Sequence, residues 1–146
     1  MFTECYCTQF RRSANALTNI YDDALRPIGL KITQLSLLRS LDRLGSATYN
    51  EIAAELSLDK TTISRNIKLL IDAGWVQISG DEDARIKVAS LSNEGARMLK
   101  QAEPHWSAAQ AKVERELKKY LKGPAKAVLL DALESLQQVG SQRKGH

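Results

Sequence analysis

Hydroxyl and cationic side chains gather on one face of a short predicted helix. The stretch LDKTTISRNIKLLIDAGWV covers residues 58–76, and its Ile63, Ile67 and Leu70 have the i, i+4, i+7 spacing of a buried face. At about 100° per residue, four polar residues share the opposite face: Thr61, Ser64, Arg65 and Lys68. Such groups bond to phosphates and base edges, whereas an ordinary solvated helix mixes Glu with Lys. The face therefore predicts contact with DNA, the alternative being a solvated surface.

A second candidate contact lies in a predicted hairpin just after this helix. Residues 75–79 and 86–91 alternate apolar and polar side chains, with Ile86 expected to face inward, and the polar GDEDAR forms the tip between them. Arg85 follows the tip, where a long cation can enter the narrow minor groove. Asp83 is placed to hold that guanidinium through a bidentate pair, or else the two form an ordinary surface ion pair.

The elements around these residues follow a recognisable order. Thr48 and Glu51 have the spacing of a capping box and begin a short helix, YNEIAAELSL. Asp59 is expected to cap the next helix, residues 60–73, and Gly74 to end it. Helix, short turn, helix and hairpin make a winged helix-turn-helix, whose second helix enters the major groove.

Two further helices precede the helix-turn-helix. Apolar residues follow in steps of three and four over residues 10–28, and Pro27 and Gly29 are expected to end that helix. Thr33 is then expected to cap a second helix, which Gly45 ends.

Two more helices follow the lobe. Ser92 is expected to cap a long one that Pro104 kinks, and the last begins after Gly123 and Pro124. The apolar stripes of the terminal helices are too long for the small lobe to cover. They favour burial across a two-fold axis, the alternative being a monomer that folds them back onto itself.

Composition narrows the class of protein. The 146 residues carry a net charge of +4, with a pI near 9.1, which is compatible with a polyanionic partner. No apolar run reaches the roughly 18 residues of a membrane span, and the start MFTECYCTQF lacks the pattern of a secretory signal, so we expect a cytoplasmic protein with no membrane partner. No nucleophile with a matching base, glycine-rich phosphate loop or metal-ligand cluster is present, so we expect no enzyme and no cofactor.

Three segments, in order, resemble the MarR family of bacterial regulators: GLKITQLSLLRSL, ATYNEIAAELSLDKTTISRNIKLLIDAGWV and DARIKVASLSNEG. The resemblance runs over roughly residues 8–140. It includes the wing pattern of the family, which here consists of Asp83, Arg85, Leu91, Ser92 and Gly95.

The resemblance implies a mainly α fold, with residues 1–146 as a single unit. Residues 31–94 would form the winged DNA-binding lobe with a two-stranded wing, and residues 1–30 and 95–146 the helices of an obligate homodimer. The dimer would read a pseudo-palindromic operator in double-stranded DNA. We expect the DNA contacts to come from Lys60, Thr61, Thr62, Ser64, Arg65, Lys68, Asp83 and Arg85.

The N-terminal segment suggests a sensor. Cys7 aligns with the reactive cysteine of the peroxide-sensing OhrR branch of the family, and Tyr21 aligns with a tyrosine that assists there. Arg11 and Ile32 replace two other tyrosines of that branch. Arg11 or Arg12 would lower the pKa of the thiol, and a thiolate oxidises to sulfenic acid.

Other interpretations of these residues stay open. Cys5 and Cys7 also fit small apolar residues at a helix start. A metal site lacks ligands, since only His105 and His146 would join the two thiols. His105 and Trp106, beside the expected kink, line an effector pocket or simply pack there.

Together these patterns predict a homodimeric transcriptional regulator, most simply a repressor that a small ligand or thiol oxidation releases from DNA. The rival class is a winged-helix module that binds proteins and has no specific DNA target.

Overall fold

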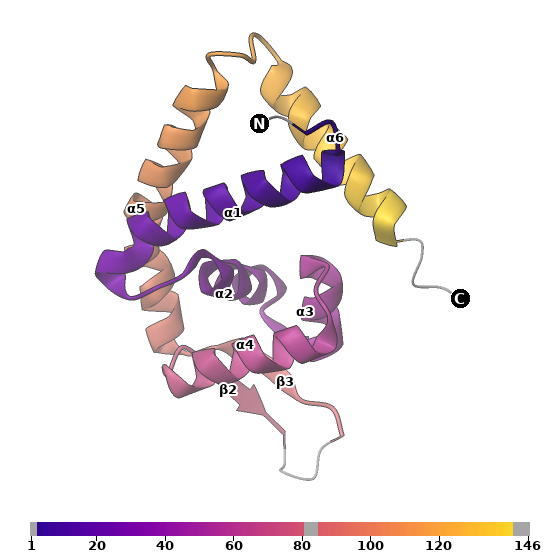
Figure 1. Cartoon of the computed structure of the whole chain (residues 1–146). Helices are drawn as coiled ribbons and strands as arrows, with labels where there is room; N and C mark the ends of the chain where they lie inside the picture. Colours follow the sequence, from indigo (N-terminus) through magenta and orange to yellow (C-terminus); the bar gives the residue numbers. More distant parts are fainter. Residues whose placement is uncertain (1–2, 81–84, 142–146) are drawn as a thin grey trace. The chain divides into compact units, whose positions relative to one another are not determined.

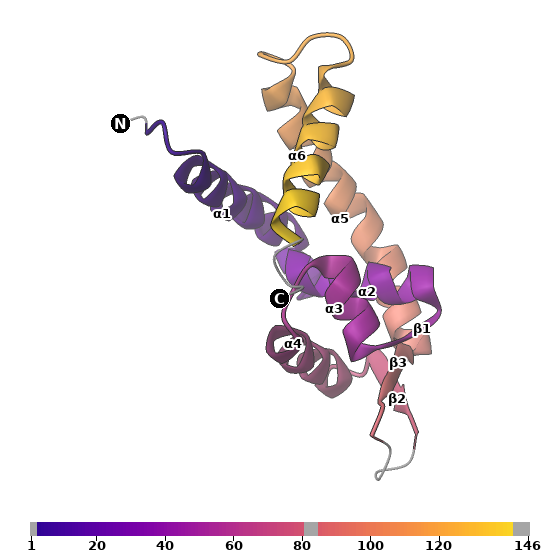
Figure 2. The same cartoon turned by 90° about the vertical axis from the view of Figure 1, so that its right-hand side faces the viewer.

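The computed structural model describes residues 3–80 and 85–141 and is mainly helical, which confirms the predicted fold class. The chain forms two compact units, residues 1–110 and 111–146. The first unit contains the winged lobe, whose helix α4 (Lys60–Asp72) lies beside the hairpin of strands β2 (Val76–Ser79) and β3 (Val88–Leu91) (Figure 1). Figure 2 shows the same hairpin extending away from the helices of this unit.

Helix α1 spans Tyr6–Leu25 and passes into a 3-10 turn, Arg26–Ile28, that Gly29 ends with a left-handed φ of 70°. Helix α2 spans Ile32–Leu44, so the expectation that Thr33 caps it was wrong. The Asp22 carboxylate of α1 accepts a hydrogen bond from the Ile32 amide at 2.8 Å, and the helix, capped at Lys31, starts two residues earlier than a Thr33 cap would place it.

The helix-turn-helix forms as its caps predict. Helix α3 spans Tyr49–Leu56, and its capping box is complete, because Thr48 Oγ1 accepts from the Glu51 amide at 3.2 Å and Glu51 Oε2 accepts from the Thr48 amide at 2.8 Å. Helix α4 spans Lys60–Asp72, begins at the Asp59 cap, and is followed by Gly74 with a φ of 81°.

The sheet has one strand more than the sequence predicted. Strands β2, Val76–Ser79, and β3, Val88–Leu91, form the expected antiparallel hairpin, and β1, Ser46–Thr48, pairs with the other edge of β3. Ala47 and Ala89 are buried opposite each other. A three-residue strand is too short to show alternation, so pattern reading missed it. Ile86 lies outside β3 and is 67% exposed, which corrects its expected inward position.

Helix α5, Asn93–Leu117, is held to the lobe at its start. Ser92 caps it as predicted, since its Oγ accepts from the Gly95 amide at 3.1 Å and donates to the Gly74 carbonyl at 2.6 Å. Gly95 is buried against the Trp75 carbonyl, and a Cβ at this position would lie 2.1 Å from that oxygen. The helix continues through Pro104, and a kink there stays a prediction.

The second unit holds the end of α5 and helix α6, Ala125–Ser141, which begins after Gly123 and Pro124 as expected. Lys126 pairs with Glu114 and, by hydrogen bonding and then by charge, lowers the pKa of that carboxyl. No residue of α6 is buried within the chain. No described helix is long and apolar enough to cross a membrane.

We predict that Gly95→Ala destabilises the fold by about 1–3 kcal/mol, because a methyl group has no room beside the Trp75 carbonyl. Gly140→Ala is the matched control, since Gly140 is also helical but a Cβ added there would meet no atom within 4 Å. It should be neutral or stabilising by up to about 1 kcal/mol. Urea unfolding at one fixed protein concentration measures both, and equal effects would contradict the close contact.

Candidate nucleic-acid interface

The buried face of α4 fixes where its polar residues point. Ile63, Ile67 and Leu70 are fully buried in the core. As a result the opposite side is open to solvent, and the exposed predicted residues are Lys60, Thr61, Ser64, Arg65 and Lys68. The amphipathic pattern of the sequence is therefore present in the structure, with hydroxyls and cations together on one exposed surface.

Thr62 has a different surrounding from the other predicted contacts. It is half-buried, its amide donates to Asp59 Oδ1 at 2.8 Å, and its hydroxyl donates to Asp59 Oδ2 at 2.7 Å. These two hydrogen bonds, the hydroxyl first, lower the pKa of the Asp59 carboxyl. Thr62 thus completes the cap of α4, and a DNA contact by its side chain stays a prediction.

The cations of this surface have no acidic partner among the described residues. The ion pairs in that part of the chain all involve other side chains, such as Arg43 with Glu55 and Arg39 with Glu103. Five basic residues are in none of them: Lys60, Arg65, Lys68, Arg85 and Lys87. Their positive charge is therefore available to an external anion.

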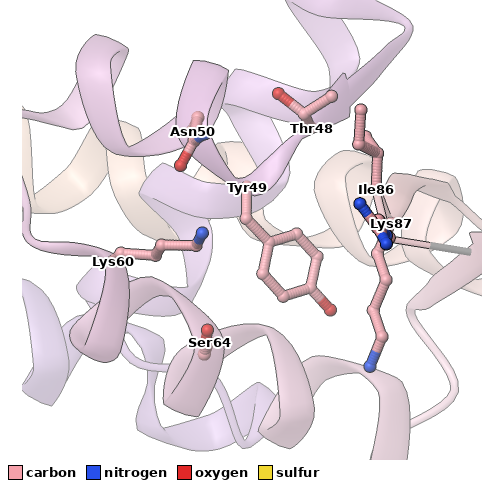
Figure 3. A pocket seen from close by; sticks show the side chains of 8 residues that line it. Thr48, Tyr49, Asn50, Lys60, Ser64, Ile86 and Lys87 are labelled. Carbon is pink, nitrogen blue, oxygen red and sulfur yellow. The ribbon is translucent and has the colours of Figure 1, made fainter.

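A hollow of about 240 Å³ opens between the start of α3, the start of α4 and the returning strand of the wing (Figure 3). Its lining residues are Thr48, Tyr49, Asn50, Lys60, Ser64, Arg85, Ile86 and Lys87. Sequence reasoning missed Tyr49, Asn50 and Lys87. No local pattern singled out Lys87, because the backbone bends at residues 85 and 86 and the strand begins only at Val88.

The predicted partner of Arg85 cannot be placed. Arg85 is exposed and lines the hollow. Asp83 lies outside the described residues, and so does the expected pair between the two side chains.

The sensing candidates are not brought together within one chain. Cys5 and Cys7 are free, exposed thiols at the start of α1. Tyr21 lies further along the same helix, about 21 Å from Cys7 at 1.5 Å per residue, and its hydroxyl bonds to Gln110 of α5. Hydrogen bonding from the Thr8 hydroxyl and then from the Thr8 amide lowers the pKa of Cys5.

The two effector-pocket candidates lie away from the hollow. Trp106 is half-buried, packs on the core of the lobe, and has the Arg39 guanidinium 4.1 Å from its ring centroid. His105 is half-buried beside it. Their role toward an effector stays a prediction. No cluster of three or more metal-ligating residues occurs in the described part of the chain.

Comparisons with known proteins agree with this geometry. A profile described as the MarR family matches residues 28–86. The chain is 35% identical over 89 residues to the HTH-type transcriptional regulator YwoH of Bacillus subtilis, a match that covers 61% of this chain and 65% of that protein. It is 30% identical over 100 residues to the regulator TcaR of Staphylococcus aureus, with 66% of each covered. The chain thus spans just under two thirds of the length of these relatives.

A solved structure is similar over nearly the full length. The Mycobacterium tuberculosis transcriptional regulator MosR, crystallised in complex with DNA, superposes with a TM-score of 0.80 and 32% identity over 95% of this chain and 98% of that one. The chain therefore belongs to the MarR family of winged-helix transcriptional regulators.

Proposed function

We propose that this protein is a sequence-specific DNA-binding transcriptional regulator that inserts α4 into the major groove. The observation that carries the proposal is the exposed face of α4, whose hydroxyls and cations have no acidic partner among the described residues. A major groove about 12 Å wide admits a helix, and such side chains reach phosphates and base edges in it. That the similar regulator MosR was crystallised with DNA supports the same use of this surface.

Within that surface, Arg65 and Arg85 have different tasks. Arg65 lies near the middle of the exposed face of α4, one turn after Thr61, where a guanidinium can pair with guanine. Arg85 lies on the wing and contributes charge toward the minor groove.

The regulator works as a homodimer. Both ends of the chain expose large apolar side chains that a single chain leaves uncovered: Tyr6, Phe10, Leu17, Val128, Leu130, Leu136 and Val139. Burying them across a two-fold axis would remove this surface from water and place two lobes on a pseudo-palindromic operator. Residues 1–30 and 95–146 would serve dimerisation and residues 31–94 DNA binding. The relatives are named as regulators, and we propose no catalytic activity. The site of action is the cytoplasm, where bacterial DNA lies.

Release from DNA would control the activity of the regulator. We infer that the regulator is a repressor, released by oxidation at the start of α1 or by a small ligand. The supporting observation is the lowered pKa of the exposed Cys5 thiol, which increases its thiolate fraction. The Cys5 thiolate would attack the terminal oxygen of a hydroperoxide, an S–O bond forms as the O–O bond breaks to give the sulfenic acid, and the alkoxide that leaves takes up a proton from water to become the alcohol. In a dimerisation helix, this change would alter the spacing of the lobes.

We predict that the protein selects a preferred sequence from random DNA duplexes and that its affinity falls steeply with salt, because phosphate contacts release counterions. Arg65→Ala should relax the sequence preference, since one guanine contact discriminates by about 1–3 kcal/mol. Arg85→Ala should weaken strong and weak duplexes alike and lower the salt slope by about one unit. Competition binding on single-base variants at several salt concentrations measures both effects.

Arg115→Ala is the control for these variants, because Arg115 is an exposed arginine of the second unit. If Arg65→Ala leaves the preference unchanged, Arg65 contacts phosphate and not a base. If the protein binds DNA without any sequence preference, the alternative class is favoured, a winged-helix module that binds proteins and has no specific DNA target.

We also predict that the exposed Cys5 thiol reacts with iodoacetamide at lower pH than an ordinary thiol does. The lowered pKa of Cys5 leaves a larger fraction of this thiol as thiolate at a given pH, and the thiolate is the form that reacts. Thr8→Val removes the first hydrogen bond and should move the Cys5 profile to higher pH. Mass spectrometry across a pH series measures the two thiols separately.

The release step is tested with single Ser variants of the two cysteines. Organic hydroperoxide should weaken DNA binding of Cys7→Ser and leave Cys5→Ser unaffected. The reverse pattern would assign the sensor to Cys7, as the family resemblance implies. Equal binding with and without hydroperoxide in the wild type would exclude oxidative release and leave a small ligand as the signal.

A further inference from the structure

We propose that the hollow between α3, α4 and the wing seats the phosphate backbone of one DNA strand, with Lys60, Lys87 and the Tyr49 hydroxyl as its contacts. The inference rests on the proposed function, because it assumes that α4 binds DNA. It assigns a task to two residues, Tyr49 and Lys87, that the sequence did not single out.

Three separate elements supply the contacts. Tyr49 is the first residue of α3, Lys60 is the first residue of α4, and Lys87 immediately precedes β3. In Figure 3 the ring of Tyr49 stands between the Lys60 and Lys87 side chains, and its hydroxyl lies on the side of Lys87. Lys60 and Ser64 are one helical turn apart, so both face the hollow while Arg65 points about 100° away from it.

Among the described residues, two carboxylates lie at the helix starts that border the hollow, and both act as helix caps. Glu51 accepts the Thr48 amide and Asp59 accepts the amide and hydroxyl of Thr62, so both negative charges serve as helix caps. Neither forms an ion pair with Lys60 or Lys87 among the described residues. The Tyr49 hydroxyl likewise has no hydrogen-bond partner in that part of the chain, so it is free to donate to an external acceptor.

Size and lining favour a backbone phosphate over a small organic ligand. Small-molecule pockets usually enclose about 300–1,000 Å³ and are lined mainly by apolar side chains. This hollow measures about 240 Å³ and is open at the surface, and the described residues that line it supply three cations and several hydroxyl or amide groups but no carboxylate. A phosphate offers the acceptor oxygens and the negative charge that this lining lacks.

Burial also suits Tyr49 to the task. Its ring packs against the core of the lobe and is held in place, and burial raises the pKa of its hydroxyl, which stays protonated as a donor at neutral pH. Since Tyr49 begins the helix before α4, a phosphate held there fixes how deeply α4 enters the groove. Contacts of this kind carry no sequence information, but they set which base pair Arg65 meets.

The test uses the full-length protein and a duplex that the wild type has selected from a random pool. Tyr49→Phe should lower affinity at least about tenfold without changing the salt slope, because it removes a hydrogen bond but no charge. Lys60→Gln and Lys87→Gln should each lower the salt slope, by about 0.9 for every phosphate that is no longer neutralised. Lys122→Gln, an exposed lysine of the second unit, is the charge-matched control and should bind as the wild type does.

A neutral methylphosphonate placed at each phosphate in turn identifies the contact. In the wild type, one position per half-site should weaken binding strongly, and in Lys87→Gln that position should lose most of its effect. Identical methylphosphonate profiles in the wild type and in Lys87→Gln would overturn the proposal. Tyr49→Phe binding with wild-type affinity would remove the hydroxyl from it. If the wild type itself selects no duplex, the failure lies with the proposed function and not with this contact.

Discussion

The burial of one aliphatic stripe of α4 determines the direction of every α4 side chain in the interface. Ile63, Ile67 and Leu70 are completely removed from water, and each such burial is worth about 1.5–3 kcal/mol. A rotation of α4 by one residue would expose all three and bury cations without partners. The resulting loss of folding free energy would exceed the gain from any new surface contact. The hydrophobic core of the lobe therefore holds the DNA-facing surface rigid before any DNA is present.

The junction between wing and α5 depends on a similar constraint. Ser92 joins the Gly74 carbonyl to the start of α5, and Gly95 lets that helix approach the Trp75 carbonyl. The chain leaves α4, enters β2, returns through β3 and begins α5 within one small region. A displacement of α5 would therefore be transmitted to the base of the wing and to Lys87. If α5 dimerises the protein as proposed, this arrangement links the dimer interface to the base of the wing.

Local patterns predicted most of the lobe, because its helices carry their own signals. The capping box at Thr48, the Asp59 cap and the i, i+4, i+7 stripe of α4 are all decided by residues close in sequence. What the sequence did not reveal depends on contacts between distant residues. The third strand exists because Ala47 pairs with Ala89, and α2 begins early because Asp22 reaches its first amide. The same holds for the interface. The exposed face of α4 was predictable from the sequence, but the positions of Tyr49 and Lys87 in the hollow beside it were not.

The electrostatics of the lobe follow from how its carboxylates are used. An isolated lysine on a protein surface usually finds an acidic neighbour, and an ion pair of this kind would compete with DNA. Here Glu51 and Asp59 accept backbone amides, and the hydrogen bonds that hold Asp59 also keep it ionised by lowering its pKa. Each carboxylate stabilises the N-terminus of a helix, where its charge also complements the helix dipole. Glu51 and Asp59 thus stabilise the starts of α3 and α4, and among the described residues neither forms an ion pair with Lys60, Arg65 or Lys87.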